Sequence, residues 1–338
     1  PVVLDKLPTL QDGDAVYQAL DVQPGEIVVD VNGDLVSLAD GVIVRPAGCA
    51  GPECAVTWDS TVPVQMDRLV INFSLKAGLT WADGAPLTSD DSLYAYELAS
   101  DPGTPVSQYV LKRTLSYTAL EQRTTQWTGL PGYFPLRFGD LYWAPLPRHA
   151  WGHLASSDLL TSELSTRTPL GWGPYVIEEW VAGDHIRLSK NPNYLRAAEG
   201  LPKFETLVFR FLGRPADSTL AALQAGECDA VDRSTGLDGQ VQAAREAELN
   251  GKLQTVIGQG PEWEQVVFGI QPAAYDDPSQ RLATNRADLF SDLRVRQAIT
   301  MCMNRERTVS YALFNQSAVP ATFLPPDHPL YAPGDEFL

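Results

Sequence analysis

Two histidines have the spacing of a pair of metal ligands. His149 and His153 lie four residues apart, so on a helix they would share one face and could bind zinc together. The zinc-hydrolase pattern His-Glu-x-x-His lacks its glutamate here, and Gly152 would interrupt the helix between the two histidines. The favoured interpretation is two surface histidines, with a metal site as the alternative, so the sequence predicts neither a metal nor a cofactor.

Two adjacent carboxylates, Asp90 and Asp91, could be interpreted as a catalytic acid and base. Neighbours in one helical turn point in different directions, however, and carboxylates in the first turn of a helix interact favourably with its dipole. The chain has no Gly-x-Ser-x-Gly elbow, no cysteine paired with a histidine as a nucleophile, and no glycine-rich phosphate loop. The residues therefore predict no enzyme, and a secreted hydrolase with scattered catalytic residues stays an alternative.

Two of the four cysteines, Cys49 and Cys54, share a short loop that is rich in turn-forming residues. Such a loop can bring two sulfur atoms together without straining a strand, and a disulfide here would indicate an oxidising compartment. The alternative is a metal clip, for which the sequence offers neither a second cysteine pair nor a nearby histidine. The favoured interpretation is a disulfide.

The chain is strongly acidic, with 25 Lys and Arg against 42 Asp and Glu and a net charge of -17. Such a surface repels phosphate backbones and anionic lipid head groups, so nucleic acid is not an expected partner. No stretch approaches the ~18 consecutive apolar residues that a membrane-spanning helix needs. The chain opens at Pro1 without a basic and apolar leader, so a signal peptide or lipid anchor is expected only outside it.

The first part of the chain is predicted to be rich in β-strands. Residues 26–31 and 34–38 suggest a hairpin around Asn32-Gly33, a pair that suits the positive φ angles of a tight turn. Residues 42–45 follow as a third strand. From residue 69 to 75 apolar side chains alternate strictly, which predicts a half-buried strand.

A helix is predicted from Asp90 to Ser100, with Ser89 as its N-cap. Residues 102–147 are rich in proline, glycine, threonine and aromatic residues, and their weak periodicity predicts an irregular subdomain. Residues 175–181 and 185–188 predict another hairpin.

A compact strand, helix and strand are predicted after this hairpin. The strands are residues 206–212 and 228–231, and the helix between them is capped by Asp217 and ends at Gly226. The simplest arrangement is a right-handed crossover between parallel strands, so the main domain is predicted to be α/β.

Four segments, in a fixed order, resemble one protein family. Residues 73–92 are similar to the family's strand, Asp-Gly turn and capped helix. Residues 171–175, Gly-Trp-Gly-Pro-Tyr, resemble its Gly-Thr-Gly-Pro-Tyr turn, and residues 191–194, Asn-Pro-Asn-Tyr, follow. Residues 223–229 are similar to its Leu-Gln-Ala-Gly-Glu-Ile-Asp. Residues 292–306 resemble its Asp-x-Arg-Val-Arg-Gln-Ala helix and the Asp-Arg-Glu that follows.

The family is the extracellular solute-binding proteins of family 5, the dipeptide-, oligopeptide- and nickel-binding proteins that serve ABC transporters. The similar segments together cover about residues 69–325. Trp172 replaces the usual Thr, Asn304 replaces the usual Asp, and the first 60 residues match the family poorly.

The resemblance implies an α/β, periplasmic-binding-protein-like fold of class II, dipeptide-binding type. The chain would hold the first lobe, with a mixed sheet and an inserted α+β subdomain, and the second lobe would be largely missing. The expected parts are an N-terminal β-rich part of the first lobe at 1–61, an inserted subdomain at 62–165, the main α/β part at 166–290 and the start of the second lobe at 291–338.

The resemblance also implies a function. It is the extracytoplasmic substrate-binding component of an ABC importer, periplasmic or on the cell surface, which captures peptides or similar small solutes for the permease subunits. A sensor or adhesion module that reuses the solute-binding fold is an alternative beside the hydrolase, since fold does not fix function.

A cleft that accepts peptides needs aromatic surface to hold a main chain and a few charges for its ends. Each candidate residue also has a structural alternative, such as packing within a hairpin or pairing with a neighbouring charge in solvent. The expected ligand-binding residues are Trp172, Tyr175, Asp232, Arg233, Trp263 and Glu264.

The cysteine interpretation can be tested by labelling free thiols in unfolded, unreduced protein. We expect Cys228 and Cys302 to react and Cys49 and Cys54 to stay unlabelled until a reductant is added, because a disulfide has no free thiol. Labelling of all four cysteines without reductant would contradict the disulfide.

Overall fold

The computed structural model describes residues 3–49, 51–59, 62–213, 216–256, 258, 265–269, 289–320, 322 and 324, without the side chains of residues 216–218, 233 and 238. The chain divides into two compact units, Pro1–Phe211 and Leu212–Leu338. Among the described residues, no helix combines the length and the apolar character that crossing a membrane would require.

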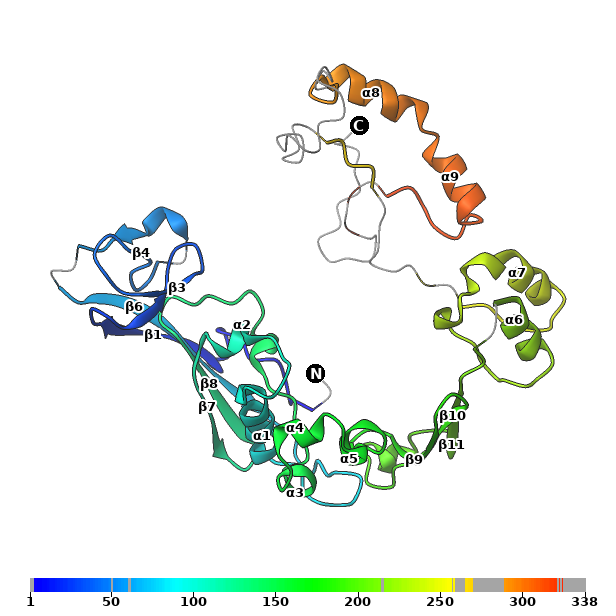
Figure 1. Ribbon diagram of the computed structural model, residues 1–338, viewed down its shortest axis with the longest axis horizontal. Helices are drawn as coiled ribbons and strands as arrows, with labels where there is room; N and C mark the ends of the chain where they lie inside the picture. The colour runs from blue at the N-terminus through cyan, green and yellow to red at the C-terminus, as the bar shows by residue number, and fades with distance from the viewer. Residues whose placement is uncertain are drawn as a thin grey trace. The chain divides into compact units, whose positions relative to one another are not determined.

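The first unit is built on a four-stranded antiparallel sheet with the strand order β1-β6-β8-β7 (Figure 1). The long strand β6 (Val64–Ser74) pairs with β1 (Ala15–Val22) on one side and with β8 (Thr124–Gly129) on the other. The sheet therefore crosses the boundary expected between residues 61 and 62. The four-part division of the chain stays a prediction.

The alternating residues of β6 form the centre of the main core, as their pattern predicts. Leu69, Ile71 and Phe73 have no exposed surface, and Trp81 and Trp127 belong to the same buried cluster. The predicted strand is confirmed. It is buried more fully than a half-buried strand, because Val70 on the opposite face is also only 6% exposed.

The prediction of an irregular segment at residues 102–147 is wrong for its middle part. β7 (Thr114–Glu121) and β8 form a hairpin that supplies half of the main sheet. Its two-residue turn, Gln122-Arg123, contains no glycine or asparagine, so the usual sequence signal for a hairpin is absent. The short helices around it are α2 (Gln108–Leu111), η2 (Phe138–Leu141), α3 (Arg148–Trp151), α4 (Ser156–Leu159) and α5 (Glu163–Thr166).

Two smaller antiparallel pairs lie near the start of the chain. The predicted hairpin is confirmed as β2 (Ile27–Val29) and β3 (Leu35–Ser37), with Gly33 at φ 89 in its turn. The predicted third strand is β4 (Ile43–Val44), which pairs with β5 (Val56–Thr57). The loop between these strands contains η1 (Pro52–Cys54) and a disulfide between Cys49 and Cys54.

The helix α1 (Ser89–Ser100) packs beside β7 and β8. The helix is confirmed, but its predicted N-cap is wrong. Thr88 is the N-cap, and its backbone N–H donates to the Asp91 carboxylate at 2.9 Å. Ser89 lies inside the helix, where its hydroxyl donates to the Glu121 carbonyl instead.

A second sheet of three antiparallel strands completes the first unit. Its order is β11-β10-β9, from β9 (Tyr175–Val181), β10 (His185–Lys190) and β11 (Thr206–Arg210). The predicted hairpin of β9 and β10 is confirmed, with Gly183 at φ 79 in the turn. The short helix η3 (Ala197–Glu199) precedes β11.

The described residues of the second unit form helices and connecting segments. α6 begins one residue before Asp217, the predicted cap, and ends shortly before Gly226, whose φ of 73 suits a left-handed cap. The helices are α6 (Ala216–Gln224), η4 (Arg233–Thr235), η5 (Leu237–Gln240), α7 (Val241–Leu249), α8 (Leu293–Cys302) and α9 (Arg305–Ala312).

The predicted parallel crossover is wrong in this structure. Residues 228–231 form no strand, and β11 pairs only with β10, antiparallel, in the part of the chain that is described. Every sheet of that part is antiparallel, so the expected mixed sheet is not found there either. Four residues form a strand only if a neighbouring edge takes up their backbone groups, and no described strand does so; Asp229 and Ala230 also have low strand propensity.

Candidate functional site

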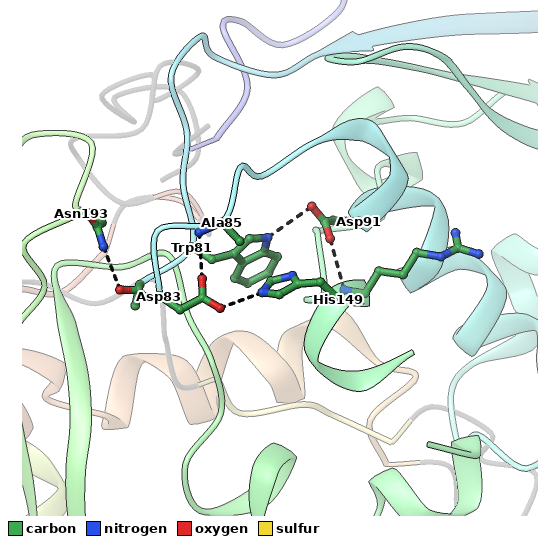
Figure 2. Close-up of polar contacts among 8 residues, drawn as sticks. Trp81, Asp83, Ala85, Asp91, His149 and Asn193 are labelled. Carbon is green, nitrogen blue, oxygen red and sulfur yellow. Dashed lines mark hydrogen bonds and ion pairs between the residues drawn. The ribbon is translucent and has the colours of Figure 1, made fainter. Parts of the chain in front are cut away.

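The turn Trp81–Gly84, which follows β6, is the meeting point of segments far apart in the sequence (Figure 2). Gly84 has a φ of +89, a conformation that favours glycine. Its N–H donates to the Trp81 carbonyl at 2.9 Å, and the Asp83 carboxylate accepts from the Ala85 N–H at 3.0 Å. These bonds close the turn and present its side chains to α1 and α3.

The Asp91 carboxylate is the buried anchor of this region, with only 5% of the residue exposed. One carboxylate oxygen accepts from the Trp81 indole N–H at 3.2 Å and from the Thr88 N–H at 2.9 Å. The other accepts from the Arg148 N–H at 3.2 Å, while the Arg148 guanidinium pairs with Glu97. Neutral N–H donors therefore compensate this buried negative charge, and they come from three segments of the chain.

The second carboxylate of this region, that of Asp83, pairs with the His149 imidazole. The His149 Nε2 lies 2.8 Å from the Asp83 Oδ2, and the centroids of the His149 and Trp81 rings are 6.1 Å apart. Partial burial acts to raise the pKa of Asp83, but the hydrogen bonds from Ala85 and His149 and the charge of His149 outweigh it and lower the pKa. Figure 2 shows Trp81 between the two carboxylates.

The two histidines do not form a metal site in the described residues. The helix α3 ends at Trp151, so it does not extend to His153, which is exposed. No group of three or more histidine, cysteine or acidic side chains suited to a metal occurs in the described part. In that part of the chain, the His149 side chain forms a hydrogen bond with Asp83 and none with a hydroxyl or thiol. The described residues therefore give the pair no nucleophile to activate.

Two asparagines join the same turn to the Gly-Trp-Gly-Pro-Tyr segment. The Asn193 side chain donates to the Ala82 carbonyl at 2.9 Å, and the Ala82 N–H donates to the Gly171 carbonyl at 2.9 Å. The Asn191 side chain, which has no exposed surface, donates to the Gly173 carbonyl at 2.7 Å. The segments that resemble the family's first and second motifs are therefore in contact.

Trp172 and Tyr175, predicted to bind ligand, lie on this joined segment. Trp172 is partly buried and packs against the main core. Tyr175 is partly buried, and its hydroxyl donates to the Phe204 carbonyl at 3.1 Å. Both residues have structural contacts, and their contact with a ligand stays a prediction.

Of the other four predicted residues, only Asp232 has a described side chain. Asp232 belongs to the second unit, where it is exposed and accepts from the Ser234 N–H at 3.0 Å and from the Ser234 hydroxyl at 2.6 Å. The backbone of Arg233 begins η4, but its side chain lies outside the described atoms. Trp263 and Glu264 lie outside the described residues.

Three residues that shape the site were not singled out by residue type in the sequence. Asp83, Asn191 and Asn193 stand inside segments that resemble the family, but nothing in the sequence assigned them a partner. His149 was considered as a metal ligand, and its carboxylate partner is 66 residues away. Contacts across such separations leave no periodic pattern that could be recognised.

Comparison with known families gives a match over most of the chain. The family model described as "Bacterial extracellular solute-binding proteins, family 5 Middle" matches residues 52–337. Among curated proteins, the oligopeptide-binding protein AppA of Bacillus subtilis is 27% identical over 261 residues, which cover 72% of this chain and 41% of AppA. A probable ABC transporter-binding protein of Deinococcus radiodurans is 26% identical over 272 residues, 73% of this chain and 43% of that protein.

Solved structures with the same fold include two proteins with bound ligands. The oligopeptide-binding protein from Thermus thermophilus, complexed with a pentapeptide, has a TM-score of 0.51 at 18% identity, and the match covers 98% of this chain and 52% of that one. NikZ from Campylobacter jejuni, in complex with Ni(L-His), has a TM-score of 0.51 at 19% identity, and the match covers 87% of this chain and 50% of that one. The chain thus has the fold of part of such proteins, and it spans about two fifths of the length of the curated relatives it matches.

The role of Asp91 can be tested against its exposed neighbour Asp90 by urea denaturation. The Asp91→Ala change leaves three N–H groups without their acceptor, among them the buried Trp81 indole, and we expect it to lower the free energy of unfolding by about 3 kcal/mol or more. The Asp90→Ala change removes only an interaction with the helix dipole and should cost about 1 kcal/mol or less. Equal losses in the two variants would contradict the anchoring role of Asp91.

Proposed function

Because the chain belongs to the bacterial extracellular solute-binding proteins of family 5, we propose that it forms part of the substrate-binding component of an ABC importer. The component captures peptides or similar small solutes outside the cytoplasm and delivers them to permease subunits in the membrane. The observation that carries the proposal is the family match, which extends over residues 52–337. The names of two relatives, an oligopeptide-binding protein and a probable ABC transporter-binding protein, support it.

The first unit is proposed to supply one wall of the ligand cleft. Trp172 and Tyr175 offer partly exposed aromatic surface on a turn that hydrogen bonds hold in place. Aromatic surface of this kind holds a peptide main chain without demanding one particular side chain. From the second unit, Asp232 and Arg233 are proposed to contribute charges for the ends of the ligand, and Trp263 and Glu264 further contacts. The relatives are more than twice as long as the segment that matches, and the additional length is proposed to supply the opposite wall.

The chain is proposed to act by binding and not by catalysis. Binding proteins close over a ligand and do not stabilise a transition state. The Asp83–His149 pair has the appearance of an orienting carboxylate and a base, but in the described residues it fixes a turn and activates no nucleophile. A hydrolase would instead show turnover that disappears on replacing His149.

Isothermal titration calorimetry with a library of di- to pentapeptides tests the proposal. The complete gene product should bind some member of the library or a comparable solute, whereas the 338-residue chain alone should show no binding tighter than about 100 μM. A ligand that loses ~100 Å² of apolar burial on one side forfeits about 2.5 kcal/mol, and lost hydrogen bonds add to this.

Three outcomes would contradict this account. Failure of the complete product to bind any of the peptides or comparable solutes would count against the importer function. Tight binding by the 338-residue chain would mean that the whole site lies within it, and the two-walled cleft would be wrong. Hydrolysis of the peptides that is abolished by His149→Ala would favour the hydrolase.

A further inference from the structure

The backbone on both sides of Trp172 is held by hydrogen bonds from other segments. The Gly171 carbonyl accepts from the Ala82 N–H at 2.9 Å. The Gly173 carbonyl accepts from the Asn191 side-chain amide at 2.7 Å, and the Pro174 carbonyl accepts from the Asn191 N–H at 2.9 Å. Asn191 therefore makes two of the three bonds that hold this turn.

At both glycines beside Trp172, the space that a side chain would occupy is open. A Cβ built on Gly173 would meet nothing within 4 Å, and one on Gly171 would meet only the Gly173 nitrogen at 3.9 Å. Glycine also has the greatest backbone freedom of any residue. The orientation of Trp172 therefore depends on the hydrogen bonds and on the contact of its ring with the core.

The Asn191 side chain is itself held by burial and by a hydrogen bond from Asn193. It has no exposed surface, and its side-chain oxygen accepts from the Asn193 N–H at 2.9 Å. The Asn193 side chain donates to the Ala82 carbonyl at 2.9 Å, and the Asn193 carbonyl accepts from the Thr80 hydroxyl at 2.9 Å. A continuous set of bonds thus runs from the turn that Asp91 anchors to the backbone that bears Trp172.

We propose that Asn191 is a positioning residue for Trp172 and raises the affinity for the solute without contacting it. The inference rests on the proposed function, because it requires Trp172 to contact the solute. An indole held in one orientation before binding loses less conformational entropy when the ligand arrives. Without the Asn191 side chain, the Gly171–Gly173 segment would sample several conformations and Trp172 would have to be ordered on binding.

The first test needs no ligand and uses the complete gene product labelled with 5-fluorotryptophan. The 19F resonance of Trp172 is assigned by its loss in Trp172→Phe. Asn191→Ser should shift or broaden this resonance and leave the other tryptophan resonances in place. Asn193→Ala, which removes only the bond to Ala82 from a partly buried side chain, is the milder variant if Asn191→Ser fails to fold.

The matched control is Gln126→Ala. Its amide donates to the Asn72 side chain at 3.0 Å within the main sheet, so the variant also loses one amide hydrogen bond but does not touch the turn. The control should leave the Trp172 resonance unchanged. An unchanged resonance in the asparagine variants, or an equal change in the control, would overturn the positioning role.

The second test is a double-mutant cycle on peptide affinity, with the same di- to pentapeptide library as the probe. Trp172→Ala should raise the apparent Kd at least about tenfold, and Asn191→Ser should raise it about threefold to tenfold. In the Trp172→Ala background, Asn191→Ser should change it by less than about twofold, because the residue it positions is absent. If Asn191→Ser raises the apparent Kd by the same factor with and without Trp172, or if Trp172→Ala does not change the Kd, the inference is overturned while the importer function stands. If the wild type binds neither the peptides nor a comparable solute, the importer function fails, and the 19F spectra still decide the positioning.

Discussion

A buried carboxylate that accepts three N–H bonds is the constraint on which the first unit depends. Asp91 lies almost fully out of water, where a negative charge is costly unless donors surround it. Its donors are the Trp81 indole and the backbones of Thr88 and Arg148. The charge is accommodated only when the turn after β6, the start of α1 and the start of α3 are all in place. One side chain therefore makes the positions of three segments interdependent.

This constraint extends to the candidate ligand site through short polar contacts. The turn that Asp91 anchors carries Asp83, which pairs with His149 and ties down α3. The same turn meets Asn193 and, through it, Asn191 and the backbone around Trp172. The backbone around Trp172, which is proposed to contact a solute, is thus linked by hydrogen bonds to the turn that carries the buried Trp81. Preorganisation of this kind suits the proposed binding function. A site that is ordered before the ligand arrives loses less conformational entropy on binding.

The sequence predicts those parts of the fold that are encoded in local periodicity. Strict alternation identifies the strand around Ile71, and an Asn-Gly pair identifies the hairpin at Gly33. The β7 and β8 hairpin is missed because its turn has neither glycine nor asparagine. The parallel crossover fails because a short segment such as residues 228–231 does not reveal whether a neighbouring edge is available, and Asp229 and Ala230 have low strand propensity.

The candidate site is less predictable because its contacts cross long stretches of sequence. Asp90 and Asp91 receive the same explanation from their place in the first turn of a helix, and only tertiary burial separates an exposed carboxylate from an anchoring one. The resemblance to the family points to the segments around Trp172 and Asn193. It does not reveal that they touch, and the remaining predicted ligand residues lie in the second unit or outside the described residues.

Hydrogen exchange measured by NMR tests the anchoring role of Asp91 most directly. The account predicts that the Trp81 indole N–H and the Thr88 and Arg148 amides exchange slowly in the wild type. It also predicts that Asp91→Ala makes all three exchange faster together, while the amides of β6 keep their protection. Fast exchange of the three groups in the wild type, or protection that survives Asp91→Ala, would contradict the account.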